Sequence, residues 1–116
     1  MPDTDFYIKE GDTSPAIQYQ LQDEDGDAIV LTGITNLRFI MSLPGAATAK
    51  VSSALAAGFV SVVNATTGIV KYLWQTGDTD TRGLYRAEWE VTYSDGTVET
   101  FPNDSYIWVE VLGDLG

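Results

Sequence analysis

The sequence predicts an all-β fold, an immunoglobulin-like antiparallel β-sandwich of about seven to nine strands. Three observations lead to this prediction: apolar and polar side chains alternate in short runs, turn-forming residues separate these runs about every ten residues, and no stretch has convincing helical spacing. The length of 116 residues fits one domain, and no linker or change in composition divides the chain. We therefore expect residues 1–116 to form a single sandwich.

Alternation in the first third of the chain predicts four strands. Phe6 to Ile8 form a short first run, and residues 17–22 alternate apolar and amide side chains, which gives a strand one wet face. Residues 23–27 are turn formers, so we expect residues 28–31 to return as the second strand of a hairpin. A further strand covers residues 37–42 and ends at Leu43-Pro44-Gly45.

The middle of the chain predicts one ambiguous segment and one hairpin. Residues 46–58 are rich in alanine, which would support a short helix, but they also alternate, and we favour an edge strand. Residues 60–63 and 69–74 are separated by the five-residue turn 64–68, so they are predicted to pair as a hairpin. In the second of these strands Val70, Tyr72 and Trp74 share one face.

The last third contains the strongest strand signal. Residues 85–93 alternate without a break, and Ser94-Asp95-Gly96-Thr97 turns the chain into a strand at residues 98–101. Pro102-Asn103-Asp104 then leads to a final strand over residues 106–112.

Composition excludes several classes of function. The chain has no cysteine and no histidine, so disulfides, thiolate metal sites, thiol nucleophiles and the commonest general base are absent, and we expect neither an enzyme nor a cofactor or metal. Seventeen acidic residues against six basic ones give a net charge of −11, which argues against binding nucleic acid or an anionic membrane. No signal peptide or membrane span is predicted.

Two groups of carboxylates could suggest chemistry, and both have simpler explanations. Asp23, Asp25 and Asp27 invite a calcium site, but the loop lacks the glycine and glutamate spacing of an EF-hand, so we interpret it as a solvated hairpin tip. Glu88 and Glu90 lie on one strand face at about the separation of a glycosidase pair. We interpret them as a solvated strand face, because an exposed strand implies no pocket.

A structural motif is predicted before the longest strand. Asp80, Gly83 and Tyr85 resemble the tyrosine corner of immunoglobulin-like domains, in which a tyrosine near the start of a strand hydrogen-bonds back to the preceding loop. We expect the Tyr85 hydroxyl to bond the loop near Asp80.

The final strand predicts a contact surface. Strict alternation places Ile107, Val109 and Val111 on one face, which we assign to the core, and Tyr106, Trp108 and Leu112 on the other. Either the N-terminal segment covers this second face, or it is an exposed aromatic stripe of the kind that is enriched in interfaces. Tyr7 raises the same question at the start of the chain. We select as interface candidates Tyr7, Tyr106, Trp108 and Leu112.

The order of motifs along the chain resembles a known family. The segments that carry the likeness are Asp5 to Pro15, Leu21 to Gly26, Val30 to Gly33, Leu37 to Met41, Thr67 to Tyr72, Gly83 to Val91 and Phe101 to Tyr106. Together they look like the N-terminal domain of the phage baseplate upper protein family. The resemblance implies an immunoglobulin-like structural adaptor of a tailed-virus particle that anchors peripheral fibres or receptor-binding proteins, with no catalytic residues to transfer.

This resemblance sets the functional expectations. We expect a virion protein, made in the host cytoplasm, whose partners are other virion proteins and copies of itself. The same fold could instead decorate a capsid or join head and tail. A different class of function, glycan binding, would use Tyr7, Trp74, Trp89 or Trp108 as stacking platforms for a host receptor sugar.

Overall fold

The computed structural model describes residues 4–115, and nearly all of its regular structure is β-strand. A single three-residue 3₁₀ turn, η1 (Leu55–Ala57), is the one helical element among these residues. The nine strands are β1 (Phe6–Lys9), β2 (Ile17–Gln20), β3 (Ile34–Ser42), β4 (Val51–Ala54), β5 (Val60–Asn64), β6 (Ile69–Tyr72), β7 (Gly83–Tyr93), β8 (Val98–Phe101) and β9 (Ile107–Leu112).

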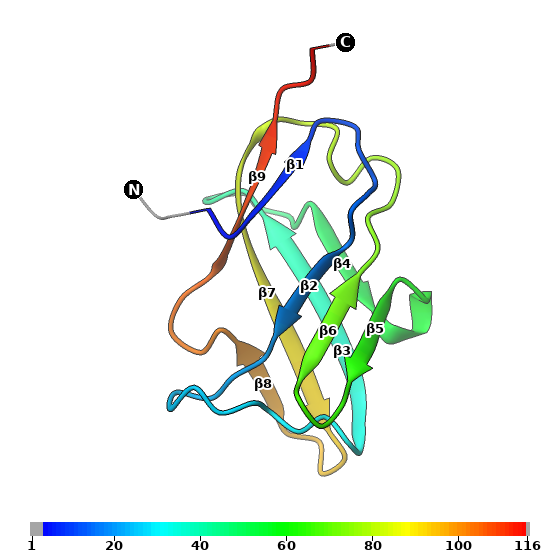
Figure 1. The fold of residues 1–116 in the computed structure, drawn as a ribbon, viewed down its shortest axis with the longest axis vertical. Helices are drawn as coiled ribbons and strands as arrows, with labels where there is room; N and C mark the ends of the chain where they lie inside the picture. The colour runs from blue at the N-terminus through cyan, green and yellow to red at the C-terminus, as the bar shows by residue number, and fades with distance from the viewer. Residues whose placement is uncertain (1–3, 116) are drawn as a thin grey trace.

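The strands form two sheets that pack face to face as a β-sandwich (Figure 1). The larger sheet has the order β1-β9-β7-β3-β4, with β8 paired to the end of β7 that β9 leaves open. The smaller sheet has the order β2-β6-β5. The predicted all-β sandwich is confirmed.

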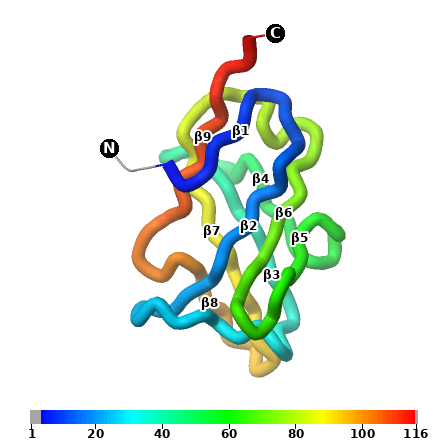
Figure 2. Tube along the Cα trace, in the orientation of Figure 1, coloured from blue at the N-terminus to red at the C-terminus, as the bar shows by residue number. Residues whose placement is uncertain are grey.

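One pairing departs from the antiparallel prediction. β1 runs parallel to β9, with Tyr7 opposite Glu110 and Lys9 opposite Leu112. The first and last strands therefore lie side by side, as the tube in Figure 2 shows. A parallel pair needs a long connection, and here almost the whole chain separates its two strands.

The first predicted hairpin forms only at its tip, and the predicted pairing of its two strands is wrong. β2 pairs with β6 rather than with residues 28–31, which form no strand and keep only an isolated bridge between Gln22 and Ala28. The Ile29 amide donates to the Leu21 carbonyl at 2.9 Å, and Leu31 is buried in the core. Leu31 therefore fills the end of the sandwich while the chain crosses from the small sheet to the large one, and Val30 remains exposed.

The segment 46–58 divides in two. Val51–Ala54 form β4 at the edge of the large sheet, as predicted, but the following alanine-rich residues wind into η1. Gly58 ends this turn with φ +89°, a conformation that side chains other than glycine rarely adopt. The hairpin of β5 and β6 is confirmed, with a turn of four residues instead of five because β5 extends to Asn64.

One hydrophobic cluster fills the space between the sheets. Its centre is Phe39 on β3, whose ring stacks on Tyr72 of the opposite sheet at 4.8 Å and 19° between planes. Trp89 lies beside Phe39 at 4.8 Å, and Trp74 meets it edge-on at 5.9 Å. Such aromatic pairs add about 0.5–1.5 kcal/mol each beyond the area that they bury.

Buried polar groups tie the loops to this core. The Tyr72 hydroxyl donates to the Asp78 carboxylate at 2.5 Å, and that carboxylate also accepts the Gln75 amide at 2.7 Å. Thr79, which is 1% exposed, donates to the Asp12 carbonyl at 2.7 Å. The loop between β6 and β7 is thereby joined to the turn that follows β1.

A pH titration tests a further polar contact, between Tyr93 of β7 and Glu99 of β8. The Tyr93 hydroxyl donates to Glu99 at 2.8 Å, and burial, then this bond and the carboxylate charge, raise the pKa of Tyr93 to about 12. Because the folded pKa is raised, the contribution of Tyr93 to stability is complete below about pH 10 and is lost as the pH rises toward 12. We expect Tyr93→Phe to reduce the fall in the free energy of unfolding over that interval, measured by urea unfolding. An unchanged fall would contradict the assignment.

Candidate functional site

The last strand divides its side chains between the core and the surface, as alternation predicts. Ile107, Val109 and Val111 are at most 2% exposed, whereas Trp108 and Leu112 are half-buried on the outer face of the large sheet. Tyr106, just before the strand, is 41% exposed. The core assignment of the β-branched set is therefore confirmed.

Trp108 lies in a small surface cluster with Tyr106 and Arg86. Arg86 of β7 is directly opposite Trp108 in the sheet, and its guanidinium carbon lies 4.6 Å from the centre of the Tyr106 ring. The two aromatic rings meet at 6.4 Å and 78°. We call these three residues the Trp108 cluster.

The N-terminal segment holds the backbone of Trp108. The Asp5 amide donates to the Trp108 carbonyl, and the Trp108 amide donates to the Asp5 carboxylate, both at 2.8 Å. Thr4 adds a bond from its hydroxyl to Glu110 at 3.1 Å. The face of Trp108 is therefore neither fully covered nor fully exposed. The N-terminal segment fixes the strand backbone, and the Trp108 ring is half-buried.

Tyr7 extends this surface onto β1, and Leu112 continues it to the end of β9. In the parallel register Tyr7 lies beside Glu110, so its ring points to the same outer face as Trp108, and it is 57% exposed. Leu112 and Tyr7 also line a shallow hollow of about 220 Å³ with Pro15. All four predicted interface residues therefore lie on the outer side of the two strands β1 and β9.

Arg86 was not identified from the sequence, although it makes the cluster chemically distinctive. Its Nε atom is buried without a hydrogen-bond partner, and within residues 4–115 no carboxylate forms an ion pair with it. A guanidinium held against an aromatic ring combines flat apolar area with a positive charge. Only the register that sets Arg86 opposite Trp108 could have revealed this.

The structure corrects the list of platforms for a glycan. Trp74 is 3% exposed and Trp89 is fully buried, because both rings belong to the aromatic cluster between the sheets. Neither ring can stack on a sugar. Tyr7 and Trp108 are the only members of that list with accessible rings.

The predicted tyrosine corner has a definite geometry. Tyr85 is buried, and its hydroxyl donates to the Thr81 carbonyl at 2.6 Å, one residue beyond Asp80. Asp80 instead pairs with Lys50, and hydrogen bonds from Lys50 and then Thr81 lower the pKa of its carboxyl. A Cβ at Gly83 would lie 3.1 Å from the Leu43 side chain, so glycine allows this close approach.

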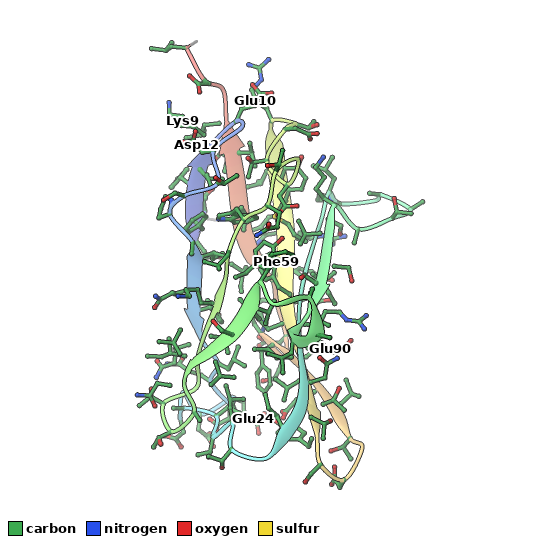
Figure 3. All side chains as sticks on the ribbon, turned by 90° about the vertical axis from the view of Figure 1, so that its right-hand side faces the viewer. Lys9, Glu10, Asp12, Glu24, Phe59 and Glu90 are labelled. Carbon is green, nitrogen blue, oxygen red and sulfur yellow. The ribbon has the colours of Figure 1, made fainter. Side chains whose placement is uncertain are left out.

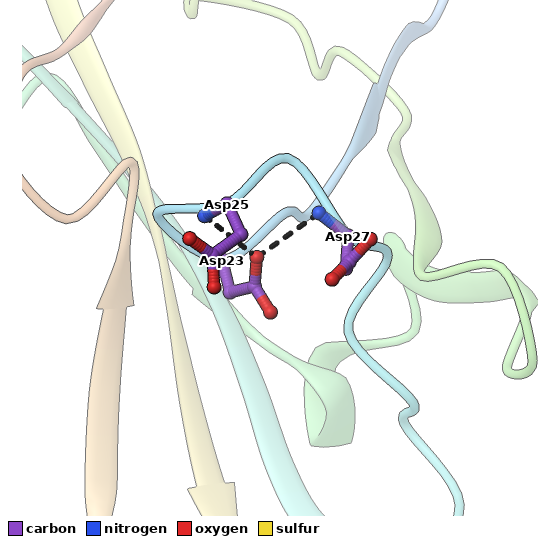
Figure 4. Close-up of side chains that lie close together, drawn as sticks. All are labelled: Asp23, Asp25 and Asp27. Carbon is purple, nitrogen blue, oxygen red and sulfur yellow. Dashed lines mark hydrogen bonds between the residues drawn. The ribbon is translucent and has the colours of Figure 1, made fainter.

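The acidic turn gathers three carboxylates, shown in Figure 4. Oxygen atoms of Asp23, Asp25 and Asp27 lie within 4.8 Å of one another. Asp23 Oδ1 accepts the backbone amides of Asp25 and Asp27 at 2.9 and 3.0 Å, which is an Asx-type turn. That turn accounts for the position of Asp23 without a ligand.

The other carboxylate pair lies on the outer face of β7. Glu88 and Glu90 are half-buried there, opposite Ile40 and Arg38 of β3. They share this face with the Trp108 cluster, since Arg86 precedes them on the same side of the strand.

Comparison of the chain with known protein families, with curated proteins and with solved structures gave no significant match. Among residues 4–115 there is no helix with the length and apolar character that crossing a bilayer requires.

Removing the Tyr85 hydroxyl tests the corner. Tyr85→Phe should lower the free energy of unfolding by about 0.5–1.5 kcal/mol, the net value of one such hydrogen bond. Urea unfolding measures this loss. Tyr106→Phe is the matched control, since no hydrogen bond is recorded for its exposed ring, and it should cost nothing measurable. Equal losses from both variants would remove the corner.

Calcium tests the acidic turn. We expect millimolar calcium to leave the melting temperature nearly unchanged, because we interpret the turn as solvated. A ligand that does not bind the folded chain does not stabilise it. Thermal unfolding with calcium and with magnesium provides the comparison. A saturable rise at low-micromolar calcium that disappears in Asp25→Asn would show a metal site at this turn.

Proposed function

We propose that this chain is a non-enzymatic assembly module of a tailed-virus particle, an adaptor of the tail or baseplate that anchors peripheral fibres or receptor-binding proteins. The virion setting rests on the resemblance to the baseplate upper protein family. Its partners would be other virion proteins and copies of itself. Capsid decoration and a head–tail position are alternative places for the same module.

The Trp108 cluster is the observation that carries this proposal. It sets two aromatic rings and an arginine without a recorded ion pair on the outer face of a rigid sheet. Tryptophan, tyrosine and arginine are the residues that contribute most to the affinity of protein interfaces. The backbone bonds from Asp5 hold the strand in place before any partner arrives, which reduces the entropy lost on docking.

The finer fold assignment, an immunoglobulin-like sandwich, belongs to the same proposal. The order β2-β6-β5 opposite β9-β7-β3-β4 corresponds to the two sheets of a variable-type immunoglobulin domain, with β1 beside the last strand. The Tyr85 bond to the loop before β7 supports this correspondence.

Truncation of Trp108 tests the docking surface. Trp108→Ala should reduce incorporation into virus particles by roughly thirtyfold or more, because a central interface aromatic contributes about 2 kcal/mol or more to binding. The isolated chain should stay folded and lose less than about 1.5 kcal/mol, well below the 3–5 kcal/mol of an emptied core site. Quantitative mass spectrometry of purified particles and urea unfolding measure the two effects.

Val98→Ala is the matched control, because Val98 is also on the large sheet and is 56% exposed, but it lies on β8 away from the cluster. It should enter particles normally. Normal incorporation of Trp108→Ala would refute the docking surface. Saturable binding of a sugar by the isolated chain, lost in Trp108→Ala, would favour glycan recognition instead.

A further inference from the structure

The acidic residues are absent from the middle of the chain. None of the 17 acids lies between Ala28 and Gly77, whereas this segment contains three of the six basic residues, Arg38, Lys50 and Lys71. The segment thus carries a charge of +3, and the remaining residues carry −14. In the fold it supplies β3 to β6, so one side of the sandwich is nearly free of negative charge.

The outer face of the small sheet is the clearest part of this acid-free region. Its outward side chains come from Gln18 and Gln20 on β2, Lys71 on β6 and Ser61 on β5. Lys71 is opposite both Gln18 and Ser61, and within the described chain it forms no ion pair. A single unpaired cation therefore lies at the centre of a neutral face.

Exposed apolar side chains surround this lysine. Phe59 is 37% exposed, Val63 48% and Leu73 43%, and the Leu73 amide donates to the Phe59 carbonyl at 2.9 Å. Figure 3 shows Phe59 midway along the molecule, with Glu10 and Asp12 toward one end and Glu24 toward the other. Part of the exposed apolar area of a protein of charge −11 thus lies on and beside strands that carry no carboxylate.

The outer face of the large sheet carries carboxylates that could meet this lysine. It combines the Trp108 cluster with Glu88 and Glu90. Glu90 has Arg38 opposite it on the same face, whereas Glu88 lies opposite Ile40, and no ion pair is recorded for either carboxylate in residues 4–115. Apolar area there could cover Phe59 and Leu73, and a carboxylate could accept the Lys71 ammonium. The two faces are on opposite sides of the same sandwich.

We propose that the small-sheet face docks on the large-sheet face of a second copy of this chain, head to tail. The inference rests on the proposed function and names the partner of its docking surface. A heterologous contact of this kind repeats, so the chains would form a row or a closed ring. A symmetric contact between two small-sheet faces would instead oppose one Lys71 to the other and leave both ammonium groups without a carboxylate.

Cross-linking separates these arrangements, because the chain has no natural cysteine. Ser61→Cys marks the small-sheet face, and Ser42→Cys marks the large-sheet face beside Arg86. The two variants are mixed and treated with a short bis-maleimide linker. We expect the mixed dimer to exceed either homodimer at least tenfold. Ser61→Cys mixed with Thr48→Cys, on an exposed loop, is the control and should give only background.

A charge reversal then tests the recognition itself. Lys71→Glu added to the Ser61→Cys chain should reduce the mixed cross-link at least tenfold, and Lys71→Arg should keep it. The melting temperature of each variant shows that the fold is intact. Leu73→Glu is a second disrupting variant on the same face, in case Lys71→Glu destabilises the chain.

The outcomes decide between this inference and the proposed function. Dominant Ser61 homodimers would overturn the head-to-tail contact in favour of a symmetric dimer, and cross-linking at control level would overturn self-association by these faces. Either result together with loss of Trp108→Ala from particles would leave the proposed function standing, with a different virion protein as partner. Normal incorporation of Trp108→Ala would refute the proposed function itself.

Discussion

The stacking of Phe39 on Tyr72 is the contact on which the rest of the sandwich depends. It is the point where the large sheet touches the small one through two aromatic faces, and Trp74 and Trp89 pack around it. Tyr72 is also held from outside, because its hydroxyl donates to Asp78. The same residue therefore sets the spacing of the sheets and the course of the loop that leads into β7.

β7 carries the consequences of this packing to the surface. Its inward residues, Tyr85 and Trp89 among them, are fixed in the core, so its outward residues have no freedom to change register. Arg86 is thereby held opposite Trp108, and the cation has a constant place beside the Tyr106 ring. A rigid core thus produces a preorganised surface cluster rather than a mobile one.

The acidic residues are distributed along the chain differently from the residues of the hydrophobic core. The core draws on both halves of the chain, but the carboxylates come only from its two ends, and the fold collects the acid-free middle on one side. Repulsion between copies is then weakest along that side. For a protein of this net charge, the position of the acids decides which faces can approach one another as much as the apolar side chains do.

The alternation of residues along the sequence by itself determined most of the strands and the two sets of side chains on β9, because side chains on a strand must alternate between two faces. Pairing was decided only by the tertiary structure. Residues 28–31 have the pattern of a strand, yet Leu31 is drawn into the core and β2 pairs with β6 instead. Trp74 and Trp89 could not be told from exposed rings for the same reason. A local pattern states which side chains share a face, but whether that face is covered depends on segments far away in the chain, and so Arg86 and Lys71 acquired their surroundings only on folding.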